Sequence, residues 1–131
     1  MSQQPLELIL ARQFADSQNV PAFIVDPEGN LIFYNEGAEE LLGIRYSETG
    51  TMEVNEWATI FTPTDEDGNP IPPEGLPLVK TLATQKPAHG SFYLINNHGH
   101  KLYIYVSSFP IEGKPDRYVG GMAFFWKTEI T

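Results

Sequence analysis

The fold of this 131-residue chain is decided by residues 22–43, which read AFIVDPEGNLIFYNEGAEELLG. Two β-branched and aromatic runs, residues 22–26 and 31–35, flank a turn rich in Pro, Gly and Asn, a pattern typical of a β-hairpin. Asn35 ends the second run and has the side chain of a helix N-cap, and Gly43 is a natural helix stop. The stretch therefore predicts a strand, a turn, a second strand and a short helix.

The segments before and after this stretch predict further helices and three more strands. Apolar residues recur at helical spacing near the N-terminus and near residue 80, whereas the C-terminal part alternates as strands do. Residues 44–77 are broken by prolines and glycines and predict no long element. The expected fold class is α+β with one antiparallel sheet. We expect helices over residues 5–16, 53–61 and 78–85, and strands over residues 91–96, 101–109 and 118–127.

The charge balance and the cysteine count exclude several classes of function. The net charge is −9, and an acidic surface repels nucleic-acid phosphates and anionic bilayers. Without cysteine the chain has no disulfide, thiolate zinc site, iron–sulfur cluster or cysteine nucleophile. No apolar run has the length of a membrane span, and the N-terminus lacks a signal-peptide pattern. We therefore expect a cytoplasmic domain that binds neither nucleic acid nor membranes.

The order and spacing of these motifs resemble a PAS domain. Residues 25–43 resemble the first hairpin of that family, the asparagine that opens the next helix, and the leucine–glycine pair that closes it. Residues 68–78 resemble a proline-bearing insert that precedes the long helix in one PAS subgroup. Residues 129–131 resemble the acidic-Ile-Thr ending, so the resemblance spans residues 14–131.

The resemblance implies a single five-stranded antiparallel sheet with short helices on its concave face. We expect residues 18–131 to form this PAS-like domain and residues 1–17 to form an N-terminal amphipathic helix for capping or dimerisation. Strand alternation predicts that the concave interior holds Phe23, Val25, Ile32, Tyr34, Phe92, Leu94, Leu102, Ile104, Val106, Met122, Phe124 and Trp126. The opposite face then carries Tyr103, Tyr105, Ala123 and Phe125, too apolar a set for a surface that meets only water.

The N-terminal helix is the candidate cover for that opposite face. Its apolar stripe caps the domain's own core, or part of the stripe contacts a second copy of the chain, and the two alternatives are compatible. The residues predicted to form a homodimer interface are Leu6, Ile9, Leu10, Phe14, Tyr103, Tyr105 and Phe125.

A hollow between the sheet and the short helices is the predicted ligand site. An apolar interior favours a small apolar ligand. Ser108 interrupts an apolar strand and is predicted to point inward, where its hydroxyl either binds a ligand or bonds to a neighbouring group. The candidate cavity residues are Phe23, Val25, Tyr34, Leu42, Leu78, Leu82, Phe92, Leu94, Ile104, Val106, Ser108, Phe124 and Trp126.

The family sometimes senses through a cofactor, and the residue types present narrow the choice. A covalent flavin adduct and a cysteine-linked chromophore both need a cysteine, so both are excluded. Haem-bearing members usually supply an axial histidine from the long helix, and residues 78–85 contain none, so we do not expect haem. His98 and His100 have no third ligand beside them, and residues 65–76 lack the Gly and Glu that a calcium loop needs at its sixth and twelfth positions. We therefore expect no metal site and no catalytic residue.

These observations predict a non-catalytic sensory or protein-interaction module of signal transduction. We expect a homodimer that acts on a signalling output domain or a partner protein, with a small apolar ligand in its core. Two alternatives remain open. One is a small enzyme on a cone-shaped α+β fold, which needs a carboxylate inside the hollow. The other is a purely structural dimerisation module with a filled core.

Overall fold

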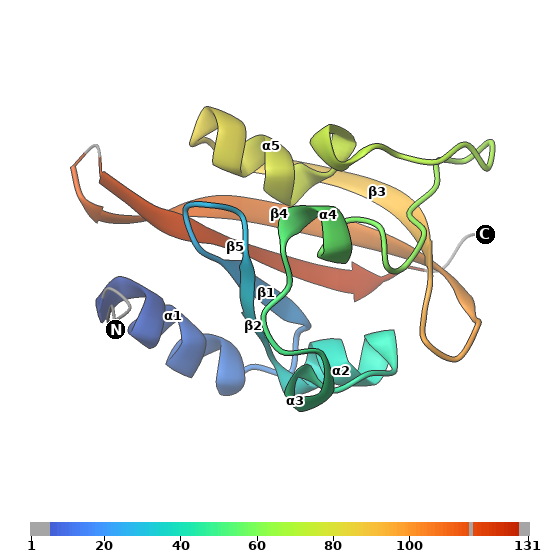
Figure 1. Cartoon of the computed structure of the whole chain (residues 1–131), viewed down its shortest axis with the longest axis horizontal. Coiled ribbons are helices and arrows are strands. Elements are labelled where there is room, and N and C mark those ends of the chain that lie inside the picture. Colours follow the sequence, from blue (N-terminus) through green and yellow to red (C-terminus); the bar gives the residue numbers. More distant parts are fainter. Residues whose placement is uncertain (1–5, 116, 129–131) are drawn as a thin grey trace.

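One antiparallel sheet of five strands, with helices on both of its sides, makes up the fold (Figure 1). The computed structural model describes residues 6–115 and 117–128. The strands are β1 (Ala22–Val25), β2 (Leu31–Tyr34), β3 (Ala88–Ile95), β4 (Lys101–Lys114) and β5 (Arg117–Lys127). The helices are α1 (Leu6–Asp16), α2 (Glu36–Leu42), α3 (Tyr46–Thr49), α4 (Val54–Trp57), the 3₁₀ turn η1 (Pro73–Gly75) and α5 (Pro77–Thr84). The strand order across the sheet is β2-β1-β5-β4-β3, which confirms the predicted fold class.

The helices divide the molecule into two layers on either side of this sheet. Figure 1 shows α4 and α5 on one side and α1 on the other. The side of α4 and α5, here called the concave side, holds the larger core, which includes Tyr34, Leu78 and Ile104. The side of α1, here called the outer side, holds a smaller cluster around Leu8 and Ile24.

The β1–β2 turn forms as the sequence predicts. Asp26 Oδ1 accepts hydrogen bonds from the backbone N–H of Glu28 at 3.0 Å and of Asn30 at 2.9 Å. Gly29 adopts φ +90°, a left-handed conformation that glycine reaches without strain. The side-chain bonds and the glycine together fix a short reversal between two strands.

A β-bulge in β2 overturns one predicted core position. The register pairs Ile24 with Phe33 and Val25 with Leu31, so Ile32 is an extra residue. Ile32 packs on the outer side, and Leu31 is completely buried in the concave core. The prediction that Ile32 faces inward is wrong because strict alternation does not allow for an inserted residue.

Strand β5 has the opposite phase from the one predicted. Directly paired residues of neighbouring strands share a face, and β1 pairs Phe23 with Ala123. Ala123 and Phe125 therefore belong to the concave core. Both faces of β5 are apolar, so hydropathy does not set its phase, and the register with β1 does. The residues predicted to face inward but found on the outer side are Met122, Phe124 and Trp126.

Helix α1 covers the outer side, but not with the predicted face. Leu8 and Ala15, seven residues apart on one helical face, are buried against the sheet. This face is small, and Leu8 Cδ2 lies so close to the sheet that an added Cβ on Gly120 would meet it at 3.1 Å. The large apolar stripe packs on the chain's own sheet only in part: its side chains are 41–65 % exposed, although Phe14 lies edge-on against Phe124 of β5. That exposed stripe comprises Leu6, Ile9, Leu10 and Phe14.

Three elements differ from their predicted ranges by more than one residue at an end. Strand β3 begins at residue 88 rather than 91, and β4 continues to residue 114 rather than 109. Pro110 is tolerated within β4 because β3 begins at Ala88, opposite Ser108, so the part of β4 beyond Ser108 has a neighbour on one side only. The helix expected over residues 53–61 is regular only over α4.

Asn35, between β2 and α2, connects elements on both sides of the sheet. Its Oδ1 accepts from Ala38 N at 3.0 Å, which confirms the predicted N-cap, and from Ala22 N at 3.0 Å. Its Nδ2 donates to Ala15 O at 2.8 Å, in the last turn of α1, and to Val20 O at 2.9 Å. The side chain is 1 % exposed, so these bonds are made out of water.

Replacing Asn35 with Ala should lower the free energy of unfolding by about 2–4 kcal/mol, because several buried backbone groups lose their partner at once. Urea unfolding followed by circular dichroism measures the change. Asn55→Ala, the same substitution at an exposed position of α4, is the control and should cost less than about 0.5 kcal/mol. Equal losses in both variants would contradict the role assigned to Asn35.

Candidate functional site

A strap, here defined as residues 52–64, crosses the concave side from one edge of the sheet to the other. At the β2 edge, Leu31 N donates to Met52 O at 2.7 Å and Met52 N donates to Leu31 O at 3.2 Å. At the β3 edge, Thr64 and Tyr93 exchange two backbone bonds of 2.9 Å each. Because each end is bonded to an edge strand, the strap forms a roof over the sheet.

The underside of this roof is apolar. Trp57 and Phe61 are buried, and Trp57 Nε1 donates to Gly29 O at 2.8 Å, so the polar atom of the indole already has a partner. Between Phe61 and Pro63, Thr62 adopts φ 50°, a left-handed conformation that costs a β-branched residue energy. Phe61 and Pro63, on either side of that corner, both line the space below.

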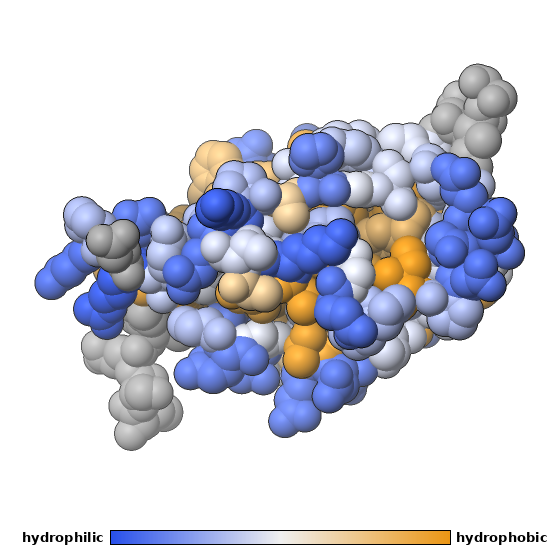
Figure 2. Space-filling view, turned by 90° about the horizontal axis from the view of Figure 1, so that it is seen from above, coloured by the Kyte–Doolittle hydropathy of each residue, from blue (hydrophilic) through white to orange (hydrophobic). Residues whose placement is uncertain are grey.

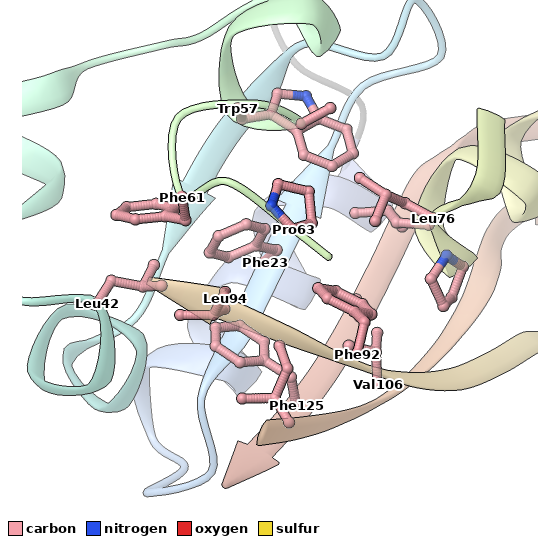
Figure 3. Close-up of a pocket in the computed structure, with 15 residues that line it drawn as sticks. Phe23, Leu42, Trp57, Phe61, Pro63, Leu76, Phe92, Leu94, Val106 and Phe125 are labelled. Atoms are coloured by element: carbon pink, nitrogen blue, oxygen red, sulfur yellow. The ribbon is translucent and has the colours of Figure 1, made fainter. Parts of the chain in front are cut away.

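The strap, α5 and the sheet line a cavity of about 70 Å³ that is partly open to solvent. Figure 3 shows its labelled side chains converging on one space from helices, strands and strap. Seen from the side of α5, apolar surface shows between hydrophilic residues near the middle of the molecule (Figure 2). The wall consists of Phe23, Leu42, Trp57, Ala58, Phe61, Pro63, Leu76, Pro77, Leu78, Phe92, Leu94, Ile104, Val106, Ala123 and Phe125.

Small residues on the concave face of β5 help to leave this space open. Ala123 lines the cavity, and Gly121 lies two residues away on the same face, where an added Cβ would meet Leu78 Cδ1 at 3.3 Å. Phe23 packs edge-on against Phe125, with ring centroids 5.0 Å apart. Had the bulky residues of β5 faced inward as predicted, they would have pointed toward this space.

The Tyr34 hydroxyl, at one end of the concave core, is satisfied by the protein. It donates to Ile44 O at 3.0 Å and lies 3.3 Å from Thr49 Oγ1. Burial raises the pKa of Tyr34 above its ordinary value, and the carboxylates of Glu39 and Glu48 add to that effect, although the Thr49 hydrogen bond opposes it. The phenol therefore stays neutral at physiological pH and holds α3 and the segment between α2 and α3 against the sheet.

Ser108 also finds a protein partner. Its Oγ lies 2.7 Å from Thr81 Oγ1 on α5 and donates to Ala88 O at 3.0 Å. Both side chains are 1 % exposed. Of the two alternatives left open by the sequence, the structure shows the one in which the inward hydroxyl bonds to neighbouring protein groups.

Seven predicted cavity residues line the cavity, and six do not. Val25, Tyr34 and Leu82 belong to or pack on the same core without lining it, and Ser108 bonds to Thr81. The predictions for Phe124 and Trp126 are wrong, because the register of β5 turns both to the outer side. The seven lining residues are Phe23, Leu42, Leu78, Phe92, Leu94, Ile104 and Val106.

Sequence reasoning missed eight wall residues, half of them in the strap and the others being Leu76, Pro77, Ala123 and Phe125. Trp57, Ala58 and Phe61 have the i, i+1, i+4 spacing of a helix face, which is a usable signal. The sequence gives no such signal for Pro63 and Leu76, because they lie in irregular segments whose positions are set by tertiary contacts. Ala123 was assigned to the wrong face with the rest of β5.

The cavity does not fit flavin or haem, the cofactors considered because of the family resemblance. Its wall has no hydrogen-bonding side chain for the polar edges of a flavin. His89, His98 and His100 are all exposed, and none of them lines the cavity, so no histidine is placed to ligate a haem iron there. Across the described ranges, no three His, Asp or Glu side chains gather as a metal site, and no helix has the length and apolarity to cross a bilayer.

A second apolar feature lies on the outer side. Phe14 packs edge-on against Phe124, with ring centroids 6.3 Å apart, and Tyr105 lies 5.1 Å from Trp126. Phe125, predicted to belong here, is 4 % exposed and lines the cavity, so that prediction is wrong. We use the name outer apolar surface for Leu6, Ile9, Leu10, Phe14, Tyr103, Tyr105 and Trp126.

Known proteins share this architecture. A family model described as PAS domain matches residues 10–77, just over half of the chain. No curated protein sequence matches significantly. The crystal structure of the PAS domain of a protein from Colwellia psychrerythraea aligns over 92% of this chain and 96% of that chain, with a TM-score of 0.65 and 18% identity.

Two further solved structures are similar to the chain. The PAS domain of Bordetella pertussis BvgS aligns over 95% of this chain and 87% of its own, with a TM-score of 0.64 and 13% identity. A Rhodobacter sphaeroides LOV protein aligns over 95% of this chain and 69% of its own, with a TM-score of 0.73 and 12% identity. At such identities the likeness shows a common fold.

The Thr81–Ser108 bond gives a testable coupling between α5 and β4. Ser108→Ala should cost about 1–3 kcal/mol of unfolding free energy, because the Thr81 hydroxyl and the Ala88 carbonyl lose a buried partner. In a double-mutant cycle measured by urea unfolding, the variant that carries both Ser108→Ala and Thr81→Val should lose less unfolding free energy than the sum of the two single losses, by at least about 0.5 kcal/mol. Ser107→Ala, on the outer face of the same strand, is the control. Strictly additive losses would show that the two hydroxyls do not interact.

Proposed function

Because the chain belongs to the PAS domain family, whose members are generally sensory and signalling modules, we propose that it is a non-catalytic sensor and interaction module of signal transduction. A small ligand occupies the core cavity, and two copies associate through the outer apolar surface. The observation that carries the proposal is the placement of both features on one sheet. The cavity lies against its concave side and the exposed apolar surface lies on its outer side.

The cavity supplies a reason for a ligand to bind. The wall is apolar and partly reached by water, and covering it is favourable by about 25 cal/mol per Å² of apolar surface removed from water. A molecule that fills the void restores contacts that the wall side chains otherwise lack. Binding is therefore favoured by packing, without any polar group.

A second copy of the chain is the occupant that the outer apolar surface fits best. Phe14, Phe124 and Trp126 make the helical and sheet parts of this region continuous, since Phe124 and Trp126 lie two residues apart on one strand face. In a two-fold dimer the helix stripe of each copy can cover the sheet of the other, so the same contacts are made twice. Each copy carries a net charge of −9, so contact between copies must be apolar and should tighten as salt screens the repulsion.

The two features share strand β5, which gives the sensor its means of coupling. Phe125 lines the cavity, whereas its neighbours Phe124 and Trp126 face the outer side. A ligand that shifts β5 therefore moves side chains on both faces. Coupling arises when the ligand has different affinities for the monomeric and dimeric arrangements.

The dimer predicts that Ile9→Glu combined with Phe14→Glu produces a monomer in sedimentation velocity. Both side chains are exposed in the single chain, so the circular dichroism of the sheet should be retained. Ile60→Glu, a change of the same kind at an exposed residue of the strap, should leave the dimer intact. A wild-type chain that sediments as a monomer at high salt would refute the proposed interface.

The coupling predicts that filling the cavity alters association. Ala123→Leu places three extra carbons in the cavity and should change the dimer dissociation constant by at least about fivefold, the lower end of usual coupling energies. Ala83→Leu, at an exposed position of α5, is the matched control and should leave that constant unchanged. An unchanged constant in Ala123→Leu would show that cavity and interface are independent.

A further inference from the structure

The wall of the cavity defines the chemistry of what it binds. All fifteen lining side chains are apolar: aromatic rings, aliphatic chains and two prolines. Phe23 meets Phe125 and Trp57 edge-on, at centroid distances of 5.0 and 6.4 Å. Such a surface offers dispersion contacts and ring edges, but no hydrogen bond and no charge.

The polar groups around the wall are already bonded to the protein. The Trp57 indole donates to Gly29 O, the Tyr34 hydroxyl donates to Ile44 O, and the Thr81 and Ser108 hydroxyls are paired. Within the described part of the chain, no buried side-chain nitrogen or oxygen lacks a partner. A ligand hydroxyl or carboxylate inside the cavity would therefore have to give up its water without replacement.

The volume limits the size of a ligand that the wall can surround completely. The cavity measures about 70 Å³, roughly half of the 150 Å³ apolar cavity that is known to stay dry and to bind benzene or xenon. A dissolved apolar gas or a short hydrocarbon fits directly. A six-membered hydrocarbon ring is the largest occupant that modest movement of the strap would admit.

We propose that the cavity is selective for uncharged molecules without hydrogen-bonding groups, no larger than one six-membered hydrocarbon ring. The inference rests on the proposed function, since it specifies the ligand class of the same site. The cavity selects its ligands by shape and by the desolvation cost of placing a polar atom against this apolar wall. Because so few atoms make contact, dissociation constants of about 0.1–10 mM are expected.

Methyl NMR tests this selectivity on the intact chain with four probes: xenon, benzene, phenol and benzoate. Xenon and benzene should shift the methyl signals of Leu78, Ile104 and Val106 in a saturable way, because these side chains line the cavity. The methyl signals of Val20, an exposed residue of the loop before β1 that neither lines the cavity nor lies on β5, should show no saturable shift and serve as the internal control. Phenol should bind at least tenfold more weakly than benzene, and benzoate should cause no saturable shift.

Two variants establish that the shifts come from the cavity. Ala123→Leu should abolish the benzene response by filling the space, whereas Ala83→Leu, exposed on α5, should leave it unchanged. If Ala123→Leu proves too unstable, Leu78→Ala gives the converse result, because the enlarged cavity should bind benzene more tightly than the wild type.

The outcomes separate the two proposals. Phenol or benzoate binding as tightly as benzene would overturn the selectivity but leave the cavity as the ligand site of the sensor. Failure of both xenon and benzene to shift the cavity methyl signals would overturn the selectivity and the ligand-binding part of the proposed function together. Loss of dimerisation with intact benzene binding would leave the selectivity standing.

Discussion

The structure depends on the bonds that one buried amide makes at the end of β2. Asn35 receives an N–H from α2 and another from β1, and gives its own two hydrogens to carbonyls of α1 and of the following loop. A helix cap alone would need only the first of these bonds. Because the same side chain also ends α1, the layer on the outer side of the sheet is placed relative to the layer on the concave side. The Asn35 side chain therefore helps to position both the cavity and the outer apolar surface.

The cavity itself follows from unequal division of residue size between the two faces of β5. Its concave face carries Gly121 and Ala123, and its outer face carries Met122 and Phe124. Bulk is thus placed under α1, where it is covered, and the opposite side keeps a gap beneath the strap. Part of the packing energy is given up at the point where a guest molecule can restore it.

Local motifs were predictable from the sequence, because their physics is contained in a few neighbouring residues. The hairpin turn, the Asn35 cap and the left-handed Gly43 that ends α2 all appear where the pattern places them. The bulge at Ile32 and the phase of β5 were not predictable, since both are set by pairing with another strand. For α1, the large apolar side chains predicted the wrong face, because the sheet is covered by the face of the helix that carries Leu8 and Ala15. The strap has helical spacing only around Trp57, and its position over the cavity is set by bonds to two distant strands.

Those bonds have a consequence for the behaviour of the chain in concentrated solution. Strands β2 and β3 are the two margins of the sheet, and Met52 and Thr64 occupy backbone groups that would otherwise invite a strand from another molecule. If the strap detached, it would expose the cavity and, at the same time, unpaired backbone amides and carbonyls along the edges of β2 and β3. In the proposed sensor, admission of a guest and protection against aggregation thus rest on the same thirteen residues, 52–64.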